Sequence, residues 1–242
     1  MKIVVVSASL SENSSTDQLG ERIALSARRE LEESKARVEV IQVRLRDLAH
    51  AITDAMLTGF PNADLESAFN SVQNADAVVA VSPAYNASYS GLFKAFFDVL
   101  PEDTLAGMPM IIGATGGTPR HSLVTEHAMR PMFVYLHALV ASTAVYAATE
   151  DWGAAAADSD GSAGSALQRR IDRSARELKN LVTMQAASRG VLVSSGAGID
   201  LSHIESKGVK SDSEIAAQSS LEDMAPEEIY SDFKSFDELL KG

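Results

Sequence analysis

The sequence contains no cysteine among its 242 residues. Disulfide bonds, thiolate nucleophiles and cysteine-ligated metals are therefore excluded within the chain. The sequence also lacks an apolar run of about 18 residues, the length that a membrane-spanning helix requires. Its N-terminal apolar run, residues 3–6, is too short for the core of a signal peptide. From these absences we expect a cytoplasmic protein with no membrane partner. His50, His127 and His137 show no metal-ligand spacing with carboxylates, so we expect no metal site.

Positive charge is scarce, because the formal net charge is −12. A general nucleic-acid-binding protein needs basic surface to neutralise phosphates, so we expect no nucleic-acid partner. Residues 191–242 contain eleven Asp or Glu and four Lys, a net charge of −7, which leaves −5 for residues 1–190. We therefore expect a folded domain at residues 1–189 and an acidic, partly disordered extension at 190–242. Within the extension, residues 226–240 could form a short amphipathic helix.

Strand-like apolar runs alternate with helical spacing along the first 189 residues. We predict strands at 2–7, 37–43, 77–82, 109–114 and 139–147, and helices at 17–33, 64–73, 91–100, 121–136 and 165–188. This alternation predicts right-handed crossovers and a parallel sheet with helices on both faces. We therefore expect an α/β, flavodoxin-like three-layer sandwich with a five-stranded parallel sheet in the order 2-1-3-4-5. Residues 44–63 contain Gly59 and Pro61 and indicate no clear element.

A polar turn, Ser9–Thr16, follows the first predicted strand and opens the first predicted helix. Hydroxyl groups and backbone N–H groups at a helix N-terminus suit a phosphate group, because the donors and the helix dipole point at the anion together. The turn has no Lys or Arg, and it lacks both the glycine fingerprint of dinucleotide sites and the Gly-Lys-Ser of a P-loop. The alternative is a serine-rich turn with an ordinary N-cap.

A second polar turn, residues 83–91, follows the third predicted strand. It offers a planar aromatic ring at Tyr85, an amide at Asn86, and hydroxyl groups at Ser88, Tyr89 and Ser90. These groups suit a flat, polar heterocycle better than a bare phosphate. The alternative is an ordinary connection in which Pro83 and Asn86 serve as turn formers.

A third turn, Thr115–Gly116–Gly117–Thr118, follows the fourth predicted strand. Two adjacent glycines allow the backbone to approach a ligand closely, although they could also form a turn that only reverses the chain. In the predicted topology the first, third and fourth strands are neighbours. Their three turns would then form one groove at the carboxyl edge of the sheet, where ligands of open α/β proteins bind.

Residues 1–150 resemble the NADPH-dependent FMN reductases of the flavodoxin-like superfamily. The most specific segment is 83–98, PAYNASYSGLFKAFFD, which is similar to the family pattern Pro-x-Tyr-Asn-x-Ser…Gly-x-x-Lys…Asp. Ser9–Thr16 resembles the family's phosphate loop and 115–117 its ring-edge loop, while 120–123 and 128–131 resemble the helix that follows. The chain departs from the family at Leu10, in a loop where many members carry Arg or Lys, and at Ser90, where many carry Pro.

The resemblance implies an NAD(P)H-dependent FMN reductase with FMN as cofactor and NADPH or NADH as hydride donor. It implies contacts to the FMN phosphate from Ser9, Ser14, Ser15 and Thr16, to the isoalloxazine ring from Pro83, Ala84, Tyr85 and Asn86, and to its pyrimidine side from Thr115, Gly116 and Gly117. Hydride transfer to flavin needs no side-chain acid or base, so we predict no catalytic residue. The resemblance also implies a homodimer or homotetramer and a flavin-dependent monooxygenase as a partner.

Three other functions stay open at this point. The chain could be a flavodoxin-type electron carrier that holds FMN without nicotinamide turnover. It could be a flavin-dependent reductase of quinones, azo dyes or metal oxyanions. It could also be an interaction module in which the acidic extension acts. Beside the third turn, Arg120 and His121 could meet the phosphates of the nicotinamide cofactor.

Overall fold

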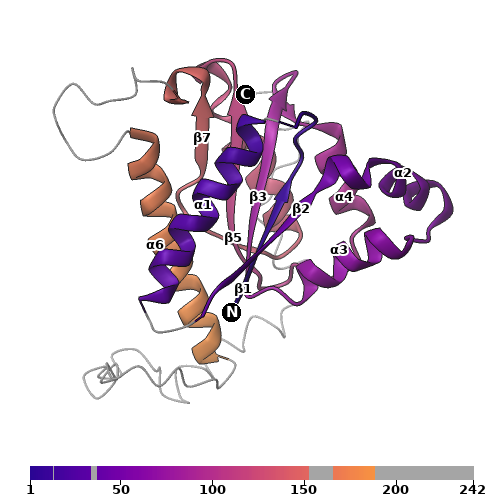
Figure 1. Ribbon diagram of the computed structural model, residues 1–242, viewed down its shortest axis with the longest axis horizontal. Helices are drawn as coiled ribbons and strands as arrows, with labels where there is room; N and C mark the ends of the chain where they lie inside the picture. The colour runs from indigo at the N-terminus through magenta and orange to yellow at the C-terminus, as the bar shows by residue number, and fades with distance from the viewer. Residues whose placement is uncertain (13, 34–36, 153–165, 189–242) are drawn as a thin grey trace, which may run out of the picture. The chain divides into compact units, whose positions relative to one another are not determined.

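The computed structural model describes residues 1–12, 14–33, 37–152 and 166–188. Within these ranges a parallel sheet carries helices on both faces, as Figure 1 shows. The acidic extension expected from residue 190, and with it the helix expected at 226–240, lie outside the described residues. In the part of the chain that is described, no helix is both long enough and apolar enough to cross a membrane.

The elements follow one another in an alternating order. The strands are β1 (Lys2–Ser7), β2 (Glu39–Arg44), β3 (Ala77–Tyr85), β4 (Ser88–Tyr89), β5 (Pro109–Gly116), β6 (Leu139–Val140) and β7 (Val145–Ala148). The α-helices are α1 (Ser15–Glu32), α2 (Ala49–Thr58), α3 (Ala63–Gln73), α4 (Gly91–Val99), α5 (Arg130–Tyr135) and α6 (Ala166–Ser188). Short helical turns lie at η1 (Leu45–Leu48), η2 (Pro119–His121), η3 (Thr125–Met129) and η4 (Thr149–Trp152).

The sheet order is β2-β1-β3-β5-β6, with β7 paired to β5 and the short β4 paired antiparallel to β3. Apart from β4, the strand pairs are parallel. The flavodoxin-like arrangement and its order 2-1-3-4-5 are therefore confirmed. The predicted count of five strands is wrong, because the sheet has seven within the described residues.

The predicted fifth strand is divided because side chains take up hydrogen-bonding groups of its middle residues. Arg130 donates to the backbone oxygens of Ala141 (2.9 Å) and Ser142 (3.0 Å). The backbone N–H of Thr143 donates to the Glu177 carboxylate at 2.6 Å. These contacts satisfy the backbone groups between β6 and β7, so the chain can leave the sheet without burying unpaired polar atoms.

The predicted helix 121–136 is also divided. Thr125–Met129 is π-helical, and the Arg130 N–H donates to the Thr125 oxygen five residues earlier. Pro131 lacks an N–H and cannot donate inside a helix, which favours such a change of hydrogen-bond spacing. The α2 helix was not predicted. At the start of α3, the Asn62 side chain accepts from the Leu65 N–H at 3.0 Å and caps the helix.

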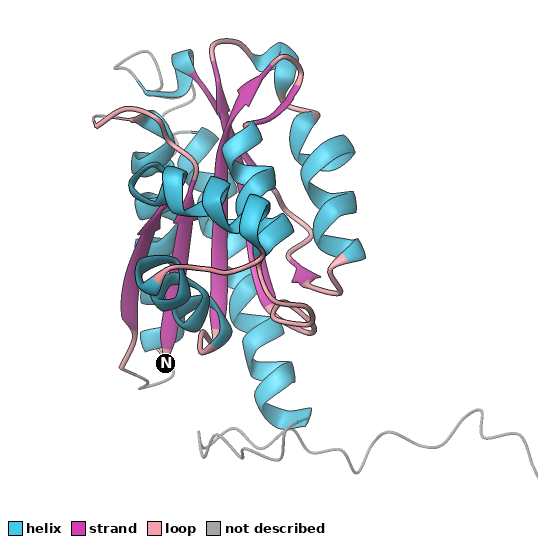
Figure 2. Ribbon diagram, turned by 90° about the vertical axis from the view of Figure 1, so that its right-hand side faces the viewer, coloured by secondary structure: helices cyan, strands magenta, loops and turns pink. Residues whose placement is uncertain are grey.

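Alternating strand residues bury two separate apolar faces. One face packs against α1 and α6, through residues that include Val5, Val79 and Ile111. The other packs against α2, α3, α4 and α5, and Figure 2 shows the helices on either side of the strands. Phe93, Phe96 and Phe97 of α4 are buried there, so this apolar face of α4 belongs to the core.

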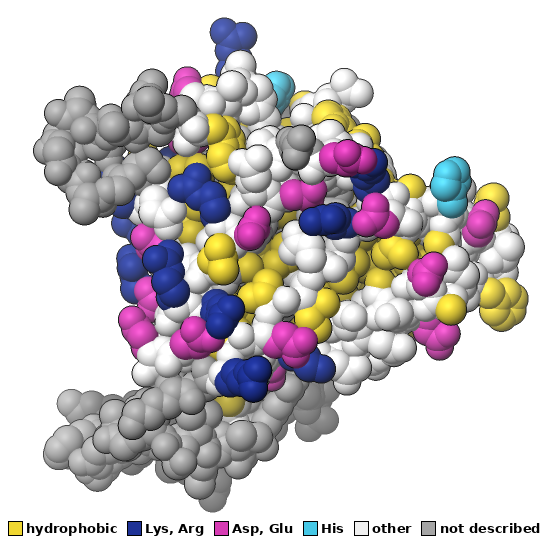
Figure 3. Space-filling model, viewed as in Figure 1, with side chains coloured by type: hydrophobic (Ala, Val, Ile, Leu, Met, Phe, Trp, Pro, Cys, Tyr) yellow, Lys and Arg dark blue, Asp and Glu magenta, His cyan; other side chains and the backbone are white. Residues whose placement is uncertain are grey.

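Helix α1 approaches the sheet closely at Gly20. A Cβ at this position would lie 2.8 Å from Val5 and 3.0 Å from Val81, so a larger residue would push the helix away. On the outer surface of α1 and α6, side chains of both charge signs are interspersed, as Figure 3 shows. They form exposed ion pairs such as Arg28–Glu32 and Lys179–Glu33, each at 2.8 Å, which contribute little to stability.

Candidate functional site

The turns after β1, β3 and β5 meet at the carboxyl edge of the sheet. The backbone N–H of Ala8, in the first turn, donates to the Val81 oxygen of β3 at 3.0 Å. Pro83 of β3 pairs with Thr115 of β5 in the sheet register. The hydroxyl groups of Thr16 and Thr115 lie 2.6 Å apart and are buried. The convergence that the topology predicted is therefore present, and the first and third turns touch directly.

The first turn presents hydroxyl groups around the N-terminus of α1. Ser14 is the N-cap, and its side chain accepts from the Thr16 N–H at 3.0 Å. Ser9 is buried and donates to the Ser11 oxygen at 2.9 Å, while Ser15 is exposed. Asp17, in the first turn of α1, accepts from the Ser7 hydroxyl. Ser14 is therefore a helix cap, as the alternative interpretation predicted, and the turn also keeps hydroxyl groups at a helix N-terminus.

The second turn is a β-hairpin and not the simple loop that we predicted after residue 82. Strand β3 continues to Tyr85 and pairs with β4 across a two-residue turn. Both turn residues have positive φ, +48° at Asn86 and +66° at Ala87, which is the backbone of a type I′ turn. Pro83 is buried in β3, and Tyr85 keeps 47% of its surface exposed. Tyr85 and Asn86 therefore stand on a hairpin beyond the edge of the sheet.

Two serines fix the passage from this hairpin into α4. The Ser90 N–H donates to the Ser82 hydroxyl at 2.9 Å, and both residues are buried. The Ser90 hydroxyl accepts from the Phe93 N–H at 3.2 Å and caps α4. Ser90, which we considered as a ligand hydroxyl, is thus occupied in capping a helix.

The third turn is held from below by Tyr146 of β7. The Tyr146 hydroxyl donates to the Thr118 oxygen at 2.7 Å. A Cβ at Gly116 would overlap this hydroxyl, whereas a Cβ at Gly117 would meet no atom within 4 Å. Burial, and then the nearby Asp151 carboxylate, raise the pKa of Tyr146, so the phenol stays neutral and keeps donating. Gly116 is therefore required by a side chain of the protein, and only Gly117 leaves space open.

Tyr146 could not be predicted as part of the site, because only the register of β7 against β5 places it under the turn. Two arginines near the first turn were not predicted either. Arg44, at the end of β2, pairs in register with Ser7 of β1, so the start of η1 lies beside the first turn. Arg44 and Arg46 line a pocket of about 310 Å³ together with Ser9. The predicted strand order could have indicated the position of these arginines, because it makes the carboxyl ends of the first two strands neighbours.

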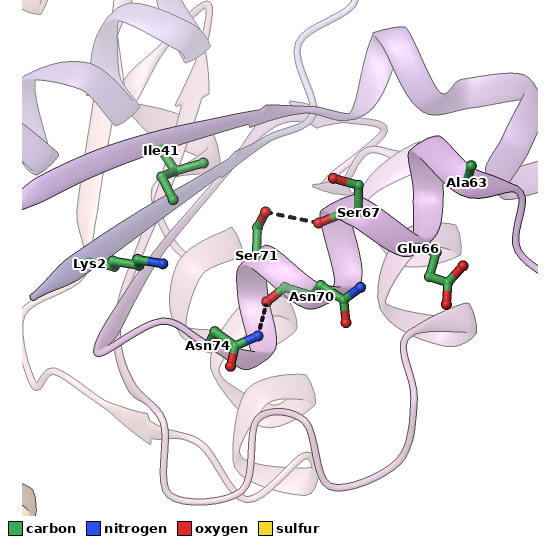
Figure 4. A pocket seen from close by; sticks show the side chains of 8 residues that line it. All are labelled: Lys2, Ile41, Ala63, Glu66, Ser67, Asn70, Ser71 and Asn74. Carbon is green, nitrogen blue, oxygen red and sulfur yellow. Dashed lines mark hydrogen bonds between the residues drawn. The ribbon is translucent and has the colours of Figure 1, made fainter.

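A different pocket, of about 630 Å³, lies away from these turns, between the start of β1 and α3. Figure 4 shows its lining, with Lys2 from β1, Ile41 from β2 and polar side chains from α3. Two of these side chains bond to their own helix, Ser71 to the Ser67 oxygen and Asn74 to the Asn70 oxygen. The pocket sits where β1 begins, opposite the edge at which ligands of such sheets bind.

The predicted site residues thus fall into two groups. Thr16, Pro83 and Thr115 lie together at the meeting point of the turns, with Ser9 and Ser14 at the adjacent N-terminus of α1. Ala84 and Gly116 are partly buried beside them. Tyr85 and Asn86 lie on the hairpin, and Ser15 and Gly117 are exposed. Arg120 and His121 are exposed on η2 after the third turn.

Comparison with protein families places this chain among flavin reductases. The model of the family described as NADPH-dependent FMN reductase matches residues 1–153. The chain is 33% identical over 150 residues to the NADH-dependent FMN reductase SfnF of Pseudomonas putida, which covers 62% of this chain and 78% of that protein. It is 34% identical over 110 residues to an NADPH-type FMN reductase of Pseudomonas aeruginosa. That match covers 46% of this chain and 59% of its relative.

Solved structures show the same similarity. An oxidoreductase from Corynebacterium diphtheriae is 38% identical, with a TM-score of 0.70 over 76% of this chain and 97% of the other. The apo form of the NADH:FMN oxidoreductase EMOB is 28% identical, with a TM-score of 0.56 over 77% of this chain and 89% of the other.

Proposed function

The chain belongs to the NADPH-dependent FMN reductase family, and from this membership we propose that its three converging turns bind FMN for hydride transfer from NADPH or NADH. The observation that carries the proposal is the buried contact between the hydroxyl groups of Thr16 and Thr115. It joins the serine-rich turn to the glycine turn, so one ligand can reach both. Pro83, paired with Thr115, brings the second turn to the same place.

The groups around this meeting point fit the parts of FMN. Hydroxyl groups at the N-terminus of α1, among them Ser14 and Ser15, suit the phosphate. Gly117 adds no side chain where the edge of the ring would approach, and the open space at this residue leaves its backbone accessible. Tyr85, half exposed on its hairpin, offers an aromatic face to a flat ring.

When bound, the flavin supplies the redox chemistry by accepting the hydride from the nicotinamide. The residues of the chain position the two nucleotides and exclude water. Buried Thr16, Pro83 and Thr115 form a rigid floor, because hydrogen bonds or sheet pairing hold each of them. Exposed Arg120 and His121 stand beside the third turn, where they can meet the phosphates of the nicotinamide cofactor. No acid or base from the protein is required.

Steady-state turnover by the full-length protein tests this function. The protein is mixed with NADPH or NADH, and loss of the reduced nicotinamide is followed with FMN, riboflavin or a quinone as acceptor. We expect rapid oxidation that depends on FMN. A protein that binds FMN without oxidising either nicotinamide would be an electron carrier, and faster turnover with quinone than with FMN would make it a quinone reductase.

Several expectations remain part of this proposal. A flavin-dependent monooxygenase is the chemically suited consumer of free reduced flavin. A homodimer or homotetramer, and a cytoplasmic location, also stay predictions. The extent of the catalytic domain, residues 1–189, is a further prediction, with the acidic extension at 190–242 outside the reductase unit.

A further inference from the structure

A pocket beside the first turn combines serine hydroxyls with two arginine side chains. The pocket has a volume of about 310 Å³ and is lined by Ser9, Ser11, Glu12, Asp17, Arg44, Arg46 and Asp47. The serines and Glu12 come from the turn after β1, and the arginines from the end of β2 and the start of η1. Register pairing of Ser7 with Arg44 holds these two segments side by side.

The arginines bring to the first turn a charge that its own sequence lacks. The turn from Ser7 to Thr16 contains no Lys or Arg. Leu45, between the two arginines, is fully buried, and this anchors the segment while Arg44 and Arg46 remain exposed. Among the residues that the structure describes, the Arg44 side chain has no hydrogen-bond or ion-pair partner, so its donors are free for a ligand. Arginine suits phosphate because its planar group can donate two parallel hydrogen bonds.

Carboxylates in the same pocket offset these charges. Glu12 forms an ion pair with Arg46 at 3.1 Å, and the Glu12 side chain is 84% exposed. Exposed pairs of this kind are weak, so a phosphate dianion can take the place of Glu12. Asp17 already accepts from the Ser7 hydroxyl. Asp17 and Asp47 remain in the lining as negative charges, so the formal charge of the lining rises from −1 to 0 when Glu12 leaves, and Arg46 then has its donors free for the phosphate.

We propose that Arg44 and Arg46 bind a phosphate monoester and that Glu12 is the internal anion that it displaces. The inference rests on the proposed function, in which two phosphate monoesters occur, the 5′-phosphate of FMN and the 2′-phosphate of NADPH. Ser9 lines the pocket and Ser14 caps α1 next to it, so the geometry favours the phosphate of FMN. Competition from Glu12 lowers the affinity for the phosphate, which suits a flavin that is released after reduction.

Flavin binding by three variants of the full-length protein tests the proposal. Quenching of flavin fluorescence gives the Kd for FMN and for riboflavin, which lacks the phosphate. Glu12→Gln removes the competitor, and we expect its Kd for FMN to fall by about fivefold, equivalent to about 1 kcal/mol. Arg44→Gln and Arg46→Gln should each raise the Kd for FMN by about tenfold. The Kd for riboflavin should stay unchanged in all three variants.

Matched controls come from an ion pair on the outer surface of α1. Arg28 and Glu32 form an exposed pair at 2.8 Å that lies away from the pocket. Arg28→Gln and Glu32→Gln change the net charge by the same amounts as the test variants, and they should leave the Kd for FMN unchanged. If the Kd for FMN changes equally in the test variants and the control variants, long-range electrostatics alone explains the effect, and the proposal is wrong.

The ratio of the KM values for NADPH and NADH separates the two phosphate sources. The variants could change the ratio of the KM values and leave the ratio of the Kd values for FMN and riboflavin unchanged. The pocket would then bind a phosphate monoester whose source is NADPH. If neither ratio changes, the inference is wrong while the reductase function stands. If the unmodified protein binds neither flavin, the proposed function fails and the inference fails with it.

Discussion

Ala87 holds a backbone conformation that is unfavourable for alanine. Its φ of +66° lies in the left-handed region, where a Cβ crowds the following carbonyl oxygen. Glycine avoids this contact but loses more conformational freedom on folding. We expect Ala87→Gly to stabilise the protein by about 0.5 kcal/mol, the balance of these two effects.

Thermal unfolding measures the effect of Ala87→Gly. A suitable control is Ala95→Gly in α4, which should lower stability by about 1 kcal/mol because glycine is unfavourable inside a helix. A loss of stability in Ala87→Gly would show that the hairpin does not hold this residue at positive φ.

Gly116 and Tyr146 form a pair that a double-mutant cycle can test. Gly116→Ala would place a methyl group on the Tyr146 hydroxyl, and we expect a loss of about 1 to 3 kcal/mol from overpacking. Tyr146→Phe removes the hydrogen bond to the Thr118 oxygen and should lower stability by about 1 kcal/mol. Together the two changes should cost less than their sum, because the phenylalanine ring leaves the new methyl group a tight but tolerable 3.2 Å contact.

The control for this cycle is Gly117→Ala, since nothing lies within 4 Å of its Cβ position. Chemical denaturation of the four proteins gives the coupling free energy. If the two changes in the free energy of unfolding are strictly additive, Gly116 and Tyr146 do not contact each other as the structure shows.

At the scale of elements, an ion pair inside the segment from η3 to α5 links stability to pH. Hydrogen bonds from Arg130 lower the pKa of Glu126 from its ordinary value of 4.5. A carboxyl whose pKa is lower in the folded than in the unfolded protein stabilises the fold above its unfolded pKa, and this contribution disappears as the pH falls through the folded-state pKa. We expect Glu126→Gln to lower stability by about 0.5 to 1 kcal/mol at neutral pH.

The difference between wild type and Glu126→Gln should shrink as the pH falls below 4.5, because the wild-type carboxyl becomes neutral as well. Unfolding by denaturant at a series of pH values measures it. Glu102→Gln, at an exposed loop residue without an ion pair to any described residue, is the control. A difference that stays constant on acidification would exclude the charged pair as its origin.

Elements with a strong local pattern could be predicted from the sequence. The buried runs of β1, β3 and β5, and the serine cap of α1, depend on residues that are neighbours in the sequence. Elements that depend on side chains distant in the sequence could not be predicted. The gap between β6 and β7 exists because Arg130 and Glu177 reach it from other elements. Helix α2 was missed because the Gly59 that terminates it marked the whole segment as a connection.

In the candidate site as well, some features could be predicted from the sequence and others depend on distant contacts. The meeting of Thr16 with Thr115 follows from the strand order, which fixes the turns that leave adjacent strands. Tyr146 supports its turn through the register of β7, and no short sequence pattern encodes that register. Arg44 and Arg46 lay in a segment with no assigned element. Their position became informative only when β2 was placed beside β1.

At the scale of the whole molecule, we propose a reductase domain that functions without the acidic extension. The family model ends at residue 153, and the described structure continues through α6 to Ser188. Helix α6 buries Leu167, Ile171 and Leu178 against the sheet, so it belongs to the same core. We expect a chain ending at residue 189 to keep its FMN-dependent nicotinamide oxidation, within about twofold of the full-length rate.

A longer deletion that also removes α6 should have the opposite outcome. Removal of α6 from residue 166 onward would expose the face that it covers, and we expect that protein to be unfolded. Circular dichroism and turnover assays compare the two deletions. Loss of activity in the folded chain 1–189 would assign the extension a direct part in the reaction.

A structure of the protein crystallised with FMN tests the central claim most directly. We expect the FMN phosphate to lie at the N-terminus of α1 beside Ser14, and the flavin ring to lie between the hairpin at Tyr85 and the turn at Gly117. A flavin bound elsewhere, for example in the pocket between β1 and α3 that Lys2 and Asn70 line, would contradict it.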